Sequence, residues 1–94
     1  MPNIRIHIFA SGRVHGVFFR DGIKKRAEKI GVFGWVKNLQ DGRVEAVIEG
    51  EENKARKLEK WAKRGPFLAD VKKLDSVEED YTGEFIKFEI KYEI

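Results

Sequence analysis

The chain has 94 residues, enough for one hydrophobic core and too few for two ordinary domains, so we expect a single domain over residues 1–94. Hydrophobic residues make up 41% of the sequence and charged residues 37%, a balance that excludes a disordered chain and predicts a soluble globular protein. The absence of cysteine excludes thiol chemistry, and a net charge of +3, from 19 basic residues interspersed with 16 acidic ones, does not by itself indicate a nucleic-acid partner.

The sequence offers few elements for a metal site or a membrane segment. His7 and His15 are the only histidines, which is too few for most zinc or copper sites in a chain without cysteine, and we assign neither of them a role from the residues alone. No window approaches the roughly 18 apolar residues that a membrane span requires, and the N-terminus has no apolar leader. We therefore expect no metal, no cofactor, no membrane association and a cytoplasmic location.

Hydrophobic periodicity alternates between that of strands and that of helices. Ile4, Ile6 and Ile8 recur at every second residue and predict a first strand with one buried face. A helical stripe follows over residues 20–30, and Gly31 is placed to end this helix in the left-handed conformation.

The middle of the chain predicts a hairpin and a second helix. Residues 32–38 are rich in aromatic and branched side chains, and strand alternation resumes at Val44 after the Asp41–Gly42 pair, which is typical of a tight turn. Residues 51–64 begin with glutamates, end with basic residues and precede Gly65–Pro66, as expected of a helix whose charges complement its dipole.

The last third predicts two more strands. Apolar side chains within residues 69–81 do not keep a strict two-residue period, so we expect a bulge or a strong twist there. Residues 85–92 alternate strictly, which predicts a strand with one face in water. The order strand–helix–strand–strand–helix–strand, with one extra strand, predicts an α+β fold, a ferredoxin-like split βαβ sandwich with an antiparallel sheet and both helices on one face.

The segment SGRVHGVFFR, residues 11–20, joins the first strand to the first helix and is unusual for a simple turn. Its glycines allow backbone N–H groups to point at an anion, and Arg20 adds a planar guanidinium that suits two phosphate oxygens. At a helix start Arg20 opposes the dipole, so helix stability does not explain it. In a split βαβ fold the first and second strands are parallel, so this loop and Asn38 should meet at one edge of the sheet. A plain turn at the glycines and a turn-forming role for Asn38 remain open alternatives.

Phe18 and Phe19 beside Arg20 interleave aromatic and basic side chains, a pattern also found where nucleic-acid bases stack. A noncatalytic phosphate- or nucleic-acid-binding module is therefore the main alternative to an enzyme, because ferredoxin-like folds host many functions. An RNA-binding sheet needs exposed aromatics on its central strands, where the alternation is short and inconclusive, so we do not expect a nucleic-acid partner.

Two motifs in this region carry a specific resemblance. The chain resembles the acylphosphatase family through GRVHGVFFR (12–20) and, after ten residues, GVFGWVKN (31–38), which are similar to the two signature motifs of that family. The segments DGRVE, GPFLADV and FEIKY of this chain fit later segments of the family, so the resemblance covers about residues 4–92. His15 stands where many members have glutamine, and Phe18 where many have a smaller residue; neither difference removes a backbone N–H from the loop.

The resemblance implies an enzyme, an acylphosphatase that hydrolyses the carboxylic–phosphoric anhydride of a small acyl phosphate to a carboxylate and inorganic phosphate. It implies that Arg20 binds the phosphate and that Asn38 orients the attacking water. The phosphate-binding positions that it implies are His15, Gly16, Val17, Phe18, Phe19 and Arg20. We further expect a monomer that needs no metal and is inhibited by inorganic phosphate. A module of a larger carbamoyl-phosphate-handling enzyme is a third interpretation, which the chain length disfavours.

Overall fold

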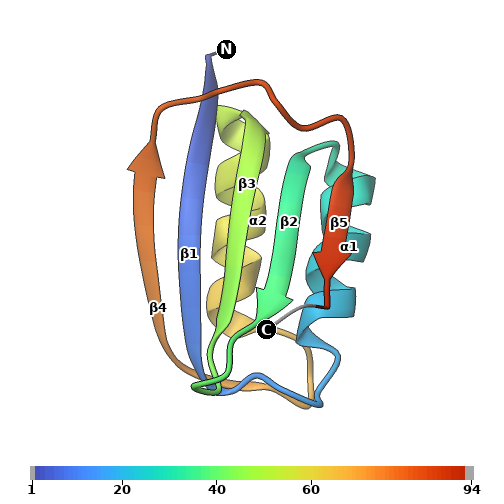
Figure 1. Cartoon of the computed structure of the whole chain (residues 1–94), viewed down its shortest axis with the longest axis vertical. Coiled ribbons are helices and arrows are strands. Elements are labelled where there is room, and N and C mark those ends of the chain that lie inside the picture. The colour runs from blue at the N-terminus through green and yellow to red at the C-terminus, as the bar shows by residue number, and fades with distance from the viewer. Residues whose placement is uncertain (1, 93–94) are drawn as a thin grey trace.

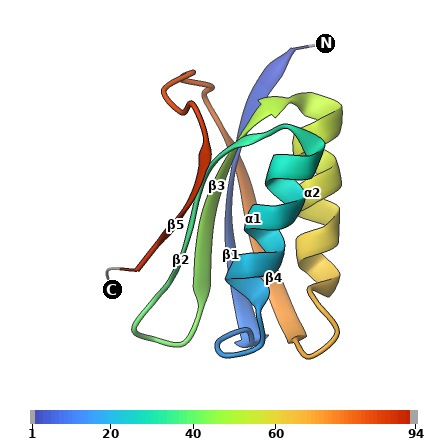
Figure 2. The same cartoon turned by 90° about the vertical axis from the view of Figure 1, so that its right-hand side faces the viewer.

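A computed structural model describes residues 2–92, which form five strands and two helices. In chain order the elements are β1 (Asn3–Arg13), α1 (Phe19–Ile30), β2 (Phe33–Asn38), β3 (Val44–Glu51), α2 (Glu52–Arg64), β4 (Asp70–Glu79) and β5 (Phe88–Lys91). The sheet has the strand order β4-β1-β3-β2-β5, and both helices cover the same face of it (Figures 1 and 2). No helix within the described residues has the length and apolar character needed to cross a bilayer.

The three central strands form the predicted split βαβ arrangement. β3 lies between β1 and β2 and is antiparallel to both, so β1 and β2 run parallel to each other. β5 pairs with β2 in the parallel sense, from Gly34 opposite Phe88 to Lys37 opposite Lys91. The ferredoxin-like fold is therefore confirmed, with a sheet that is mostly rather than wholly antiparallel.

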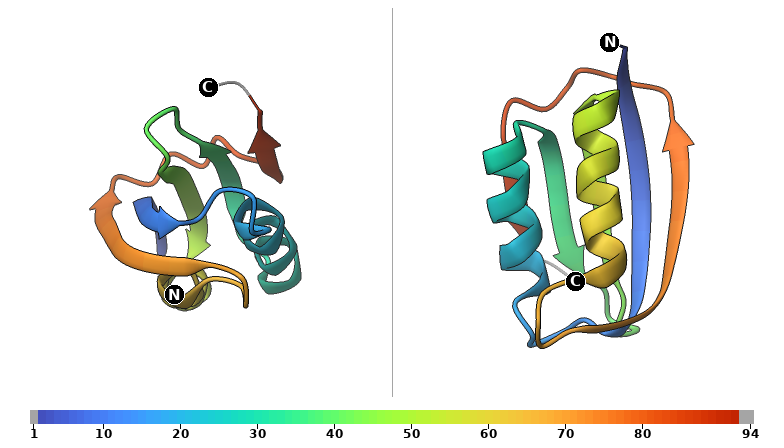
Figure 3. Two further views of the ribbon diagram at one scale, coloured as in Figure 1. Left: turned by 90° about the horizontal axis from the view of Figure 1, so that it is seen from below. Right: turned by 180° about the vertical axis from the view of Figure 1, so that it is seen from behind.

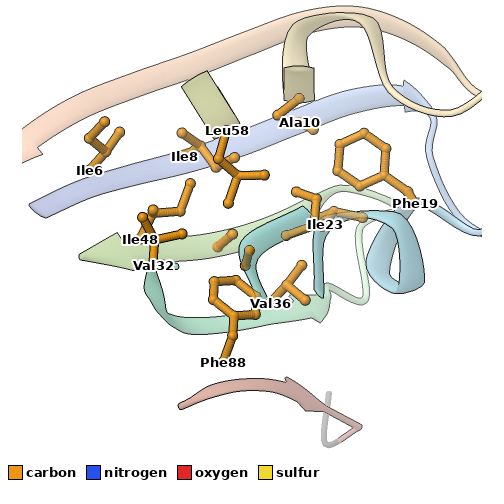
Figure 4. Close-up of a cluster of buried hydrophobic side chains, with 14 of the residues drawn as sticks. Ile6, Ile8, Ala10, Phe19, Ile23, Val32, Val36, Ile48, Leu58 and Phe88 are labelled. Carbon is orange, nitrogen blue, oxygen red and sulfur yellow. The ribbon is translucent and has the colours of Figure 1, made fainter. Parts of the chain in front are cut away.

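The core lies between the sheet and the two helices. Ile6 and Ile8, on the predicted inner face of β1, are fully buried, and α1 contributes Phe19 and Ile23 to the same cluster (Figure 4). Burial of each such side chain stabilises the fold by roughly 1.5–3 kcal/mol. Gly31 ends α1 in the left-handed conformation, with φ of 93°, as predicted. This packing fixes the first turn of α1 against the sheet.

The irregularity expected within residues 69–81 is present. Ser11 pairs with Lys73 and Gly12 with Val71, which leaves Lys72 as an extra residue on β4. Gly12 has φ of 115°, and a Cβ atom there would lie 2.3 Å from the carbonyl oxygen of Asp70, so only glycine fits at this bulge. The last strand is shorter than the predicted 85–92, because residues 80–87 serve as the connection from β4 to β5.

This 80–87 connection crosses the end of the sheet (Figure 1). Beneath it lies Glu49 of β3, whose side chain is only 2% exposed. The Glu49 carboxylate accepts hydrogen bonds from the N–H of Thr82 (2.9 Å), its hydroxyl (3.0 Å) and the N–H of Gly83 (3.1 Å). Arg5 of β1 adds an ion pair at 3.3 Å. Four donors therefore compensate the burial of one charge.

Candidate active site

The β1–α1 connection and the C-terminal end of β2 meet at one edge of the sheet, as the topology predicted (Figure 3). A pocket of about 230 Å³ lies at this edge and brings Arg20 and Asn38 together. Its lining residues are Val14, Gly16, Phe18, Phe19, Arg20, Asp21 and Asn38. Val14 and Asp21 were not among the predicted site residues, whereas the predicted His15 and Val17 do not line the pocket.

The loop backbone adopts left-handed conformations at two positions. Gly16 has φ of 70° and Phe18 has φ of 65°, and Phe18 is the one described non-glycine residue with positive φ. A left-handed non-glycine residue costs roughly 1–2 kcal/mol. A Cβ at Gly16 would meet nothing within 4 Å, so glycine serves the backbone angle there rather than close packing. Left-handed residues that alternate with ordinary ones turn successive N–H groups toward one concave side, which suits an anion.

The N–H groups of this loop are available for such an anion. Phe18 caps α1 without a side-chain hydrogen bond, and the first backbone bond across the helix start runs from Gly22 N–H to Phe18 O at 2.9 Å. None of the N–H groups of residues 15–20 donates to another group within the described part of the chain. Free amides at a helix N-terminus also carry its partial positive charge. The loop is therefore a set of unused donors directed at one pocket.

Arg20 stands at the mouth of this pocket. Its guanidinium carbon lies 5.1 Å from the centre of the Tyr92 ring, in a cation–π contact, and it forms no ion pair with a carboxylate of residues 2–92. Ring contact limits the motion of the side chain without occupying its N–H groups. The planar fork is thus held in place with its donors free.

Asn38 is the last residue of β2 and pairs with Val44. Its Oδ1 atom is buried and has no hydrogen-bond partner among the described residues. A buried carbonyl oxygen without a donor costs about 1–3 kcal/mol. The position therefore lacks a donor, and a water molecule in the pocket reaches this oxygen once the Asn38 side chain turns it toward the pocket.

His15 connects the loop to the β2–β3 hairpin. Its Nε2 atom lies 2.8 Å from the carbonyl oxygen of Arg43, which also accepts the Leu39 N–H at 2.8 Å. Because a carbonyl oxygen only accepts, Nε2 carries the proton and donates. In the same hairpin, the Asp41 carboxylate accepts one hydrogen bond from the backbone N–H of Arg43 and another, at 2.8 Å, from the Arg43 guanidinium. Both hydrogen bonds lower the pKa of Asp41 below its usual value, and the backbone bond is the larger cause.

Sequence reasoning missed this link because the Arg43 carbonyl lies 28 residues from His15. The usable signal was chemical: an imidazole N–H is a side-chain donor that a backbone carbonyl can accept. His15 therefore fixes where the loop stands relative to the strand end that bears Asn38.

The donor set of the pocket consists of backbone amides, one guanidinium and one amide oxygen. No group of three or more histidine, aspartate or glutamate side chains suited to a metal ion occurs in residues 2–92. Such a set can bind a tetrahedral oxyanion and hold one water molecule beside it.

Comparison with known proteins gives a consistent result. The family model described as "Acylphosphatase" matches residues 6–90. A curated acylphosphatase from Syntrophobacter fumaroxidans is 45% identical over 92 residues, covering 98% of this chain and 95% of the relative. One from Pyrobaculum calidifontis is 50% identical over 88 residues, covering 93% and 80%. The crystal structure of acylphosphatase from Bacillus subtilis superimposes with a TM-score of 0.90 at 35% identity, covering 95% of this chain and 99% of that one.

Proposed function

Because the chain belongs to the acylphosphatase family and catalyses the hydrolysis of acyl phosphates, we propose that the pocket between the 15–20 loop and Asn38 is its active site. In this proposal Arg20 and the loop amides bind the phosphoryl group, and Asn38 orients the attacking water. Family membership sets aside the alternative of a noncatalytic binding module.

Phosphoryl binding is assigned to the loop because its donors have no other partner. Gly16, Phe18, Phe19 and Arg20 of this loop line the pocket, and the Arg20 guanidinium offers two parallel N–H groups to two phosphoryl oxygens. In the transition state negative charge spreads over the same oxygens. Donors already fixed in place stabilise that charge without reorganising.

Water orientation is assigned to Asn38 because its free Oδ1 accepts one hydrogen bond from a water beside the bound phosphate. The side-chain amide is not a base at neutral pH, so it orients the water and does not deprotonate it. The phosphoryl oxygens of the substrate are then the proton acceptor. A carboxylate leaving group needs little protonation, so positioning and charge stabilisation suffice for the reaction.

The observation that carries the proposal is the buried and unpartnered Oδ1 of Asn38 in the pocket that Arg20 lines. A site that only bound phosphate would use the loop amides and Arg20 but would have no use for this acceptor. The substrate is a small acyl phosphate, and inorganic phosphate, the product, inhibits competitively because it occupies the same donors. Residues of one chain line the pocket, and we propose that the enzyme acts as a monomer.

Arg20→Lys tests the phosphate clamp. Lysine keeps the charge but loses the two-pronged geometry, so turnover of benzoyl phosphate should fall by about 10²-fold or more. Arg13→Lys is the matched control, because Arg13 is exposed and lies outside the pocket. Both proteins are assayed with and without EDTA. Near-normal turnover by Arg20→Lys would show that Arg20 is not the clamp, and loss of wild-type activity in EDTA would show that a metal is required.

A further inference from the structure

We propose that a second cleft, on the helical side of the molecule, binds a nucleoside polyphosphate. This cleft lies between α1 and the segment that follows α2, and its volume of about 820 Å³ falls in the size range of small-molecule sites. Its basic and aromatic lining residues are Lys25, Arg26, Lys29, Trp61, Arg64 and Phe67, named here the basic cleft. It shares no lining residue with the catalytic pocket.

Positive charge gathers in the basic cleft without compensation. Lys25, Arg26, Lys29 and Arg64 form no ion pair with any carboxylate of residues 2–92, and no acidic residue lines the cleft. Arg5, by contrast, contacts three glutamates. The cleft therefore gathers four of the 19 basic residues of the chain with no carboxylate of the described residues in contact with them.

Lys29 and Arg64 lie in the last turns of α1 and α2, where positive charge suits the helix dipole, so only the spacing of Lys25 and Lys29 needs a further explanation. Lys25 and Lys29 lie four residues apart on α1, where like charges repel each other across one helical turn. Their position on one wall of a cleft, with Arg64 at the end of α2, directs several N–H donors into the same space. A ligand with several negative charges would relieve this repulsion, which is why the cleft suits a polyanion.

The aromatic side chains of the basic cleft indicate that the ligand also contains a planar ring. Phe67 is 100% exposed, so its ring gains nothing from burial in the free protein. Trp61 is half-buried, and the Arg26 guanidinium lies 4.9 Å from the centre of its ring. Gly22 allows the two helices to meet closely here, since a Cβ on it would lie 2.6 Å from the Trp61 ring. The exposed Phe67 ring beside unpaired cations suits a ligand that joins a planar ring to phosphates.

The neighbouring surface favours a short ligand over a nucleic-acid strand. A groove continues from the basic cleft toward the catalytic pocket, sharing Gly22, Lys25 and Pro66 with the cleft. Asp21 and Glu28 line this groove together with Lys24 and Lys25, and Lys24 pairs with Glu28 at 2.7 Å, so the groove offers a phosphate backbone no excess of positive charge. A nucleoside triphosphate places its whole charge within the cleft and does not need that path.

Isothermal titration calorimetry in magnesium-free buffer tests the proposal with adenosine triphosphate as the probe. We expect saturable binding of one molecule per chain, with weaker binding of both adenosine and inorganic triphosphate, because each supplies only half of the contacts. Lys29→Gln combined with Arg64→Gln should raise the dissociation constant at least about tenfold. Lys57→Gln combined with Lys60→Gln, an equal loss of charge from exposed α2 positions outside the cleft, should leave it unchanged.

Each contrary outcome overturns the proposal. Absence of saturable binding would show that there is no site, and equal binding of inorganic triphosphate would show that the rings take no part. Binding unchanged by the Lys29 and Arg64 substitutions, or lost in Arg20→Lys, would place the nucleotide elsewhere. Wild-type turnover of benzoyl phosphate by the Lys29 and Arg64 double variant shows that it is folded.

Discussion

Replacing Asn38 with alanine separates the orientation of water from the binding of phosphate. In the structure the Oδ1 atom accepts no hydrogen bond from the described residues, so its removal breaks no hydrogen bond of that atom. We expect the free energy of unfolding to change by less than about 1 kcal/mol. Loss of a positioned water should lower kcat by about 10²-fold or more. The inhibition constant of phosphate should stay near wild type, because Arg20 and the loop amides are intact.

The assay pairs benzoyl phosphate kinetics, measured well below the melting transition, with inhibition by inorganic phosphate. Asn53→Ala, an exposed substitution on α2, is the control for loss of the same side chain. A folded Asn38→Ala protein that turns over at the wild-type rate would make Asn38 a turn residue. If the phosphate inhibition constant instead rises in proportion to the fall in kcat, Asn38 binds the phosphoryl group and the assignment of the water is wrong.

Three further substitutions test parts of the structure. His15→Ala should lower kcat by about tenfold because the loop is misplaced, whereas His15→Gln keeps a side-chain donor and should have a kcat near wild type. If both variants lower kcat equally, His15 does not position the loop. Gly34→Ala should prevent folding, as judged by circular dichroism, because its Cβ would lie 1.9 Å from the Val47 carbonyl oxygen; a native melt would contradict this. The hydrogen bond from His7 is the main cause that lowers the pKa of Glu79, so this contribution to stability is present above the unfolded-state pKa and is lost as pH falls through the folded-state pKa. When the pH is lowered from 7 to 3, the melting temperature of Glu79→Gln should therefore fall less than that of the wild type.

Local patterns predicted the elements and the meeting of the loop with Asn38. One buried face of a strand was predicted from the two-residue period at Ile6 and Ile8, and one of a helix from the stripe through Ile23. All three side chains are buried in the structure. The predicted topology then placed the loop beside Asn38, because the parallel strands β1 and β2 must end at the same edge of the sheet. These inferences succeed where one residue and its near neighbours in sequence determine the outcome.

Features that depend on distant partners were not predictable in this way. Glu49 alternates with Ile48 along β3 and looks solvated from sequence, yet the 80–87 connection buries it. The parallel pairing of β5 with β2 depends on how that connection crosses the sheet, which strand periodicity does not encode. In the site, the contact of His15 with the Arg43 carbonyl is of the same kind, since backbone acceptors carry no sequence signal.

Glu49 ties the formation of the sheet to the docking of a late part of the chain. Before the 80–87 connection is in place, its carboxylate is hydrated, and closing the surface over it without Thr82 and Gly83 would cost several kcal/mol. Thr82 lies 33 residues from Glu49, a long loop to close, so we expect these contacts to form late, after most of the folding barrier is crossed. Weakening them speeds unfolding more than it slows folding, so Glu49 governs how long the native protein persists rather than how fast it is reached.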